Sequence, residues 1–271
     1  MNFELEKAAK RGDQLQVVIL AGGKGTRISE ETRVIPKPMI EIGNVPMIVH
    51  IMRHFASFGH KDFVIALGYR GHVIKEYFSN FHLFNSNLTL DTSTGEVSTS
   101  GTNLDDWRIS LIDTGVDTLT GGRIKRLTNY LDDEFFLTYG DGLSDIDLDK
   151  LLDFHKEKEC IATVTAVHPP ARFGALELSG DIVIKFSEKN LEHAGWINGG
   201  FFVCSKKLLD FIEDDHTILE TQPMEALVRG RALRAFRHEG FWHPLDSMRD
   251  KTALEELYSN GNTPWLKHLP K

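Results

Sequence analysis

The sequence lacks three features that mark common protein classes: many cysteines, a long apolar run and an excess of positive charge. Its 271 residues include two cysteines, Cys160 and Cys204. Each stands inside a strand-like apolar run, and neither has the Cys-x-x-Cys spacing of a metal or redox site. We therefore expect two buried free thiols, and neither a disulfide framework nor a thiolate metal site.

The lack of a long apolar run argues against a membrane protein, and the negative charge argues against a nucleic-acid-binding protein. No apolar stretch approaches the roughly 20 residues that span a bilayer, and residues 1–14 are polar, unlike a signal peptide. We expect a cytoplasmic protein without membrane contact. The formal net charge of -8 also argues against nucleic acid as a partner. A small anionic ligand remains compatible with that charge, because cations outnumber acids in the glycine-rich segment 22–38.

Short apolar runs alternate with segments of helical spacing through the first part of the chain. The runs predict strands at 15–21, 63–67, 107–112, 134–139 and 161–167. The spacing predicts helices at 46–58, 72–78, 122–131 and 147–158. This alternation is typical of an α/β fold, a Rossmann-like and mostly parallel sheet with helices on both faces. The length fits one domain, which we place at 15–271 after an N-terminal extension.

The pattern changes after Pro170, and we place the boundary of the α/β core there. Short β-like pieces at 175–178, 182–186 and 196–204 predict a small β-rich lobe. Helices at 223–228 and 247–259 predict a helical C-terminal piece, and the two parts together span 171–271. The polar segment 85–106 has a hairpin signal around Ser93-Thr94-Gly95. We predict that it is either a surface excursion or a subunit contact.

A glycine-rich loop follows the first predicted strand. Glycines at this place let backbone N–H groups approach a bound anion. The dinucleotide fingerprint fails because Ile28 stands at its last glycine, and the P-loop pattern fails because Gly25 follows Lys24. A plain tight turn is the structural alternative. The nearby cations Arg27 and Lys37 favour a phosphate site.

The amino-acid sequence of this loop resembles the signature of a known family. Leu20-Ala21-Gly22-Gly23-Lys24-Gly25-Thr26-Arg27, followed by Pro36-Lys37-Pro38, resembles the signature of sugar-1-phosphate nucleotidyltransferases. From about residue 16 to 266 the chain is similar to the glucose-1-phosphate cytidylyltransferases of that family. The similar segments include Thr120-Gly121-Gly122-Arg123, Thr138-Tyr139-Gly140-Asp141-Gly142, Arg172-Phe173-Gly174, Ile197-Asn198-Gly199-Gly200 and Gly240-Phe241-Trp242.

The resemblance implies a nucleotidyltransferase fold of the GT-A-like type and a magnesium-dependent reaction. It implies transfer of a cytidylyl group from CTP to glucose 1-phosphate, which gives CDP-glucose and pyrophosphate. It also implies a role in nucleotide-sugar biosynthesis, such as that for lipopolysaccharide O-antigen, and assembly into a homo-oligomer, a trimer or hexamer.

The resemblance also implies roles for individual residues. Arg27, Lys37 and Asp141 form the implied catalytic set, and Asp141 with Asp246 would carry the Mg²⁺. The nucleotide-binding set comprises Leu20, Ala21, Gly22, Gly23, Lys24, Gly25, Thr26, Arg27, Lys37, Thr114, Thr120, Gly122 and Tyr139. The set that binds sugar phosphate comprises Gly174, Glu188, Lys189 and Asn198. Asn190 departs from the family pattern, which has proline after the Glu-Lys pair.

The chemistry of the residues agrees with these roles. Asp141 lies between two glycines at the end of a predicted strand, where open α/β sheets bind ligands, and Mg²⁺ prefers carboxylate oxygens. A sugar phosphate has a second pKa near ~6, so the nucleophile is already ionised at neutral pH. Positioning and charge neutralisation then supply the catalysis. An acceptor for the cytosine amine is expected from backbone carbonyls of 113–122 or from Thr114 or Thr120.

Three alternatives remain open from the sequence. One is a nucleotide-dependent oxidoreductase, which the broken fingerprint disfavours. Another is a catalytically silent homologue that binds sugar nucleotides, although Arg27, Lys37 and both carboxylates are retained. The last is a transferase that uses UTP, dTTP or another hexose phosphate.

Overall fold

The computed structural model describes residues 14–25, 28, 32, 34–101, 105–170, 175–179, 182–187 and 195–269, with the strands between 175 and 187 described by their backbone. The predicted N-terminal extension lies outside these residues except for Gln14. Among the helices of the described ranges, none has the length and apolar composition that crossing a bilayer requires.

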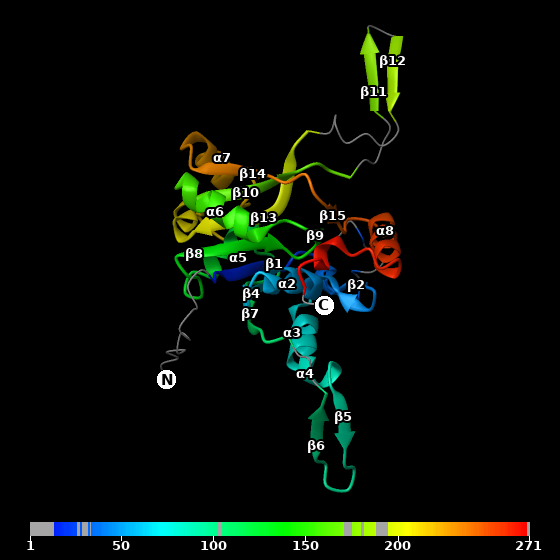
Figure 1. Cartoon of the computed structure of the whole chain (residues 1–271). Helices are drawn as coiled ribbons and strands as arrows, with labels where there is room; N and C mark the ends of the chain where they lie inside the picture. The colour runs from blue at the N-terminus through cyan, green and yellow to red at the C-terminus, as the bar shows by residue number, and fades with distance from the viewer. Residues whose placement is uncertain are drawn as a thin grey trace.

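A seven-stranded sheet forms the centre of the molecule (Figure 1). Its strands are β1 (Gln16–Ala21), β4 (Asp62–Leu67), β7 (Arg108–Asp113), β8 (Glu134–Tyr139), β10 (Ala162–Val167), β13 (Ile197–Ser205) and β14 (Leu233–Arg237). Their order across the sheet is β14-β10-β13-β8-β1-β4-β7. β1 pairs in parallel with β4 and β8, β4 with β7, and β10 with β14, whereas β13 is antiparallel to both neighbours. The predicted mostly parallel α/β fold is therefore confirmed.

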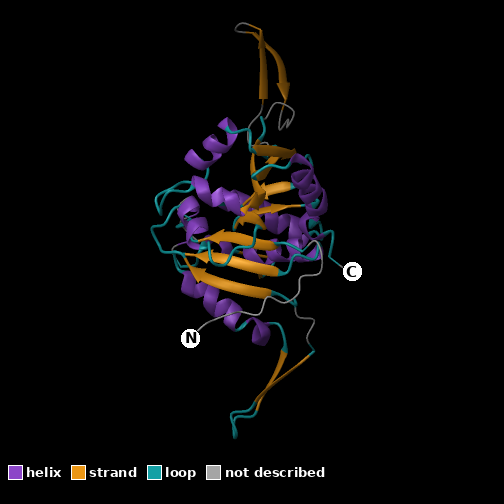
Figure 2. Cartoon of the chain, turned by 90° about the vertical axis from the view of Figure 1, so that its left-hand side faces the viewer, coloured by secondary structure: helices purple, strands orange, loops and turns teal. Residues whose placement is uncertain are grey.

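Helices cover both faces of this sheet (Figure 2). Because side chains alternate along a strand, Val17 and Ile19 of β1 join one core cluster and Val18 and Leu20 join the other. The first cluster packs against α2 (Met47–Ser57), α3 (Gly71–Ser79), α6 (Leu148–Lys158) and α8 (Met248–Ser259). The second packs against α5 (Thr120–Arg126), the 3-10 helix η4 (Lys206–Phe211) and α7 (Gln222–Arg229). Each fully buried Leu, Ile or Phe contributes about 1.5–3 kcal/mol, so the two layers hold the sheet rigidly.

The later strands differ from the sequence-based expectation. The segment 196–204 was expected in the small lobe, but β13 lies inside the main sheet between β10 and β8. Its first residues deviate from regular pairing: the β10–β13 register shifts between Val164 and Ala166, and Gly200 has φ of 78°. This irregular start explains why the segment reads as a short β piece. β14 was not predicted, because two of its five residues are arginines and they interrupt the apolar pattern.

Short elements complete the fold. They are η2 (Lys37–Met39), β2 (Glu41–Ile42), β3 (Val45–Pro46), α4 (Phe81–Phe84), β5 (Asn87–Leu90), β6 (Val97–Ser100), β9 (Gly142–Ser144), β11 (Ala175–Ser179), β12 (Ile182–Ser187), β15 (Trp242–Pro244) and η5 (Pro264–Leu266). β11 pairs with β12, and β9 pairs with β15. β5 and β6 form the hairpin predicted around 93–95, and both views show it extending away from the body (Figures 1 and 2).

Candidate active site

A cavity of about 340 Å³ lies beyond the carboxyl ends of the adjacent parallel strands β1 and β8. Ligands of open α/β sheets bind at this edge. Its lining comes from the glycine-rich loop, η2, the start of α5 with the residues before it, the end of β8 with the residues after it, and the segment between β15 and α8. The lining residues are Leu20, Ala21, Gly22, Gly23, Gly25, Lys37, Pro38, Thr118, Leu119, Thr120, Arg123, Tyr139, Gly140, Asp141 and Asp246.

The glycines of the loop differ in what they are needed for. Gly25 has φ of 60°, and a Cβ there would lie 2.8 Å from the Thr32 side chain, so a larger residue would be strained. A Cβ on Gly22 would lie 2.3 Å from the guanidinium carbon of Arg123. A Cβ on Gly23 would meet no atom within 4 Å. Packing therefore requires Gly22 and Gly25, whereas Gly23 keeps the backbone open towards the cavity.

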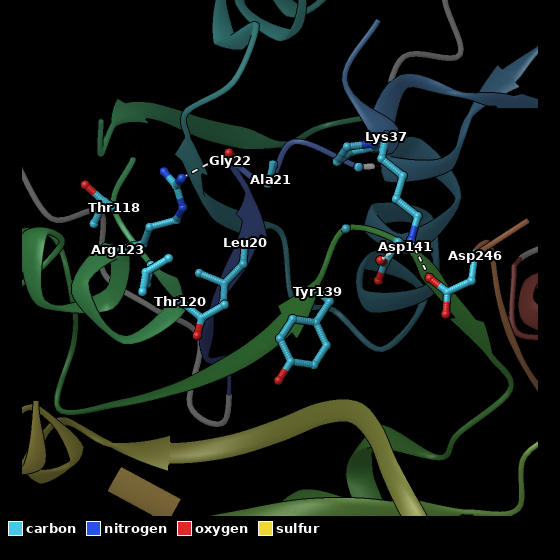
Figure 3. Close-up of a pocket in the computed structure, with 15 residues that line it drawn as sticks. Leu20, Ala21, Gly22, Lys37, Thr118, Thr120, Arg123, Tyr139, Asp141 and Asp246 are labelled. Atoms are coloured by element: carbon cyan, nitrogen blue, oxygen red, sulfur yellow. Dashed lines mark hydrogen bonds and ion pairs between the residues drawn. The ribbon is translucent and has the colours of Figure 1, made fainter. Parts of the chain in front are cut away.

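Lys37 lies between the two carboxylates that the sequence assigns to the metal site (Figure 3). Its Nζ donates to Asp141 Oδ2 at 2.6 Å and to Asp246 Oδ1 at 2.7 Å. The Lys37 side chain is 11% exposed, so the ion pairs are largely shielded from water. Burial alone would lower the pKa of Lys37, but the two carboxylates more than offset it, and the pKa lies above its usual value. The ammonium is therefore charged at neutral pH.

The Pro-Lys-Pro element sets the position of Lys37. Pro36 is extended (φ -68°, ψ 146°) and leads into η2, which begins at Lys37. Pro38 then packs on Gly140: a Cβ at Gly140 would lie 2.7 Å from Pro38 Cγ. The contact brings η2 against the residue preceding Asp141, which places the ammonium beside that carboxylate.

A short ladder brings Asp246 to Asp141. β15 pairs with β9, with Pro244 opposite Gly142, so the residues after β15 pass those before β9. The Leu245 N–H donates to the Asp141 carbonyl at 2.8 Å. Ser247 then caps α8 by accepting from the Asp250 N–H, and the Asp246 N–H donates to Asp250 Oδ2 at 3.1 Å. The backbone on both sides of Asp246 is thus fixed.

Arg123 holds the opposite side of the cavity together, a role that sequence reasoning missed. Its guanidinium donates to the carbonyls of Gly22, Leu67 and Gly115 at 3.0, 3.1 and 2.6 Å. It also donates to Thr114 Oγ1 at 2.8 Å. Burial lowers the pKa of Arg123 below its usual value, yet an arginine remains charged at any ordinary pH. One buried cation therefore joins the glycine-rich loop to the loops after β4 and β7.

Tyr139 lies between the Lys37 side and the Arg123 side of the cavity (Figure 3). Its hydroxyl donates to Glu220, and Thr120 Oγ1 donates to the other oxygen of that carboxylate at 2.7 Å. Asn198 Nδ2 donates to the Tyr139 hydroxyl at 3.3 Å. Burial, followed by the charge of Glu220, raises the pKa of Tyr139, so the phenol keeps its proton. Sequence reasoning did not find Glu220, which precedes α7 and belongs to no motif.

The structure brings most of the predicted site residues to the cavity and places some elsewhere. Thr114 is fully buried, with its hydroxyl bonded to Leu67 and Arg123, and it does not line the cavity. Gly122 packs against the backbone of Asp215, where a Cβ would lie 2.5 Å from Cα.

The remaining predicted residues lie in three places: at the surface, at a second cavity, or outside the described residues. Lys24 is exposed and pairs with Asp117 at 3.0 Å. Asn198 lines a smaller cavity of about 40 Å³ that shares Tyr139 and Asp141 with the larger one. The predicted site residues Thr26, Arg27, Gly174, Glu188 and Lys189 lie outside the described residues.

This chain is similar to known proteins in sequence and in fold. The model of the family described as nucleotidyl transferase matches residues 16–243. A glucose-1-phosphate cytidylyltransferase of Salmonella typhi is 47% identical over 93% of this chain and 98% of its own length. A protein of Bacillus subtilis, named a probable glucose-1-phosphate cytidylyltransferase, is 42% identical over 93% of this chain and 99% of its own. The crystal structure of HddC from Yersinia pseudotuberculosis shares the fold, with a TM-score of 0.65 at 22% identity over 90% of this chain and all of that one.

Proposed function

Because this chain belongs to the nucleotidyl transferase family and, within it, to the glucose-1-phosphate cytidylyltransferases, we propose that it transfers the cytidylyl group of CTP to glucose 1-phosphate. The products are CDP-glucose and pyrophosphate. We also propose the cytoplasm as the place of the reaction.

One observation supports the proposal most strongly: a buried ammonium and two carboxylates meet in the cavity that the glycine-rich loop lines. Two polyanions must approach each other in this reaction, so cations and backbone N–H groups aimed at phosphate are what the chemistry requires. An oxidoreductase would need none of this arrangement. The Lys37 cluster therefore favours phosphate-transfer chemistry over the nicotinamide alternative.

The two carboxylates suit Mg²⁺. They already hold a cation, the Lys37 ammonium, at 2.6 and 2.7 Å. Mg²⁺ takes one or two protein carboxylates and completes its shell with phosphate oxygens and water. We propose that Asp141 and Asp246 hold the ion, which, when bound, would neutralise charge on the triphosphate.

The chain's own residues supply position and charge rather than a base. The sugar phosphate oxygen is already ionised and attacks the α-phosphorus, a P–O bond forms, and the bond to pyrophosphate breaks. Gly22, Gly23 and Gly25 present backbone to the triphosphate. Lys37 provides positive charge for the phosphate oxygens. We place the sugar on the Asn198 side of Tyr139, next to the smaller cavity.

Nucleotide preference tests the cytidylyl assignment. The segment Thr118–Leu119–Thr120 lines the cavity, and we propose that its backbone contacts the base. The exocyclic amine of cytosine requires a hydrogen-bond acceptor in the protein. Uracil has no such amine, so the acceptor stays unpaired when UTP binds, which weakens UTP binding by about 1–3 kcal/mol. With glucose 1-phosphate as acceptor, we expect kcat/KM for CTP to exceed that for UTP by about 5- to 150-fold.

The same assay separates the other triphosphates. We expect dTTP to be poorer than UTP, because it lacks the ribose 2′-hydroxyl and adds a methyl group. Pyrophosphate release measures each reaction. A higher kcat/KM for dTTP or a purine triphosphate than for CTP would contradict the cytidylyl assignment and leave the broader transferase function intact.

We also propose a homo-oligomer, a trimer or hexamer, that uses the β5–β6 hairpin. Leu88, Leu90 and Val97 are each about half exposed, at 52%, 54% and 50%. Leu90 pairs with Val97, and Leu88 lies two residues before Leu90, so all three share one face. An isolated hairpin is only marginally stable in water, which supports a second copy packing on this face.

Light scattering should show that Leu88→Lys/Leu90→Lys lowers the assembly mass; an unchanged mass would contradict this interface.

A further inference from the structure

The cavity wall formed by Tyr139 and Thr120 suggests a further role for a neighbouring residue. This role rests on the proposed function. Tyr139 lines both the larger cavity and the smaller one. Asp141, two residues further on, also lines both. The orientation of the tyrosine ring therefore determines the shape of two neighbouring compartments, one assigned to the nucleotide and one to the sugar.

The hydrogen bonds that hold the ring run in one direction. The Gly200 N–H donates to Asn198 Oδ1 at 2.8 Å, which turns the amide nitrogen of Asn198 towards Tyr139. Since the Tyr139 oxygen accepts from that nitrogen, its proton goes to Glu220. On the other side, the Leu219 N–H donates to Thr120 Oγ1 at 2.9 Å, so the proton of Thr120 also goes to Glu220.

Glu220 is the acceptor on which both hydroxyls converge. It does not itself line the larger cavity, whereas Tyr139 and Thr120 do. A carboxylate accepts at both oxygens, and bonds to an ionised acceptor are stronger than neutral ones. No other common side chain of this length can accept both protons: a glutamine would present a donor to one of the two hydroxyls.

We propose that Glu220 is a positioning residue that fixes Tyr139 and Thr120, and so shapes the wall between the nucleotide and sugar compartments. Glu220 touches neither substrate and acts through the two hydroxyls. Because the wall faces both compartments, loss of Glu220 weakens the binding of both substrates. The rate of transfer from the fully loaded enzyme changes little, because Lys37 and the two aspartates are unaffected.

A double-mutant cycle tests this role. The variants are Glu220→Ala, Tyr139→Phe and the double variant, measured for kcat, for KM of each substrate and for the Kd of CTP. Tyr139→Phe should raise both KM values about tenfold, the effect of a lost hydrogen bond to a charged group, with kcat within about twofold. Glu220→Ala, which also loses the Thr120 bond, should raise them at least as much. The double variant should resemble Glu220→Ala, because that change already removes the Tyr139 contact together with the Thr120 contact. Glu225→Ala is the matched control, since Glu225 is exposed and pairs only loosely with Arg229 at 3.7 Å.

Several outcomes would overturn the inference. These are unchanged KM values in Glu220→Ala, losses that multiply in the double variant, or a loss confined to kcat. Glu220→Gln, which keeps the size of the side chain, replaces Glu220→Ala if the latter unfolds, and an unchanged KM in it also counts against the role. If the wild type turns over no pair of substrates, the proposed function fails, and the same cycle on the Kd of CTP still decides the role of Glu220.

Discussion

Asp141→Asn is expected to lower kcat at least 100-fold at saturating Mg²⁺ while the protein stays folded. The change keeps the shape of the side chain and removes the charge that pairs with Lys37 at 2.6 Å. Charge stabilisation of this kind supplies several kcal/mol in metal-assisted transfer, and each ~1.4 kcal/mol is tenfold in rate. Folding persists because Lys37 keeps its bond to Asp246 and because Asp141 lies outside both apolar clusters.

Asp106→Asn is the matched control for this prediction. Asp106 also pairs with a lysine, Lys61, at 2.7 Å, but it is 76% exposed. Its activity should equal that of the wild type. Asp141→Asn could instead keep the wild-type melting temperature and more than about a tenth of the wild-type rate. That result would show that Asp141 is not part of the metal site.

Lys37→Met is expected to lower kcat about 100- to 1,000-fold. The substitution preserves the length of the buried stem and deletes the ammonium that contacts both carboxylates. It therefore removes positive charge where two polyanions react, a loss comparable with that of an oxyanion-hole donor. Lys61→Met, which alters the exposed ion pair, is the matched control and should keep the wild-type rate.

The same variant has a second readout that does not depend on turnover. Without Lys37, Asp141 and Asp246 keep two negative charges close together with no ammonium between them. Added Mg²⁺ should then raise the melting temperature of Lys37→Met more than that of the wild type, where the ammonium competes for the same oxygens. An equal Mg²⁺ response in the two proteins, or a normal kcat in the variant, would contradict this account of Lys37.

The sequence was informative wherever a residue's role depends on its near neighbours. The apolar run of β1 followed by glycines placed the loop, and Asp141 was placed by its position at the end of β8. Fold class and family are confirmed, while the roles of the site residues stay predictions.

Features that depend on contacts distant in sequence were not predictable. Asp141 and Asp246 meet through β9 and β15, each three residues long, which is too short for an alternating pattern. The partners of Arg123 are mostly backbone carbonyls from three loops, for which a sequence carries no signal. Thr114 was one of the groups expected as an acceptor for the cytosine amine, but its hydroxyl donates to the Leu67 carbonyl and accepts from Arg123 instead. Glu220 likewise reaches Thr120 across 100 positions.

The most direct test of the proposed reaction follows the phosphorus atoms of CTP. The protein is incubated with glucose 1-phosphate, Mg²⁺ and CTP labelled at either the α- or the γ-phosphate. Cytidylyl transfer predicts that the α-label appears in CDP-glucose and the γ-label in pyrophosphate, in equal amounts. A γ-label in a phosphorylated sugar, or no labelled sugar nucleotide from the α-labelled CTP, would contradict it.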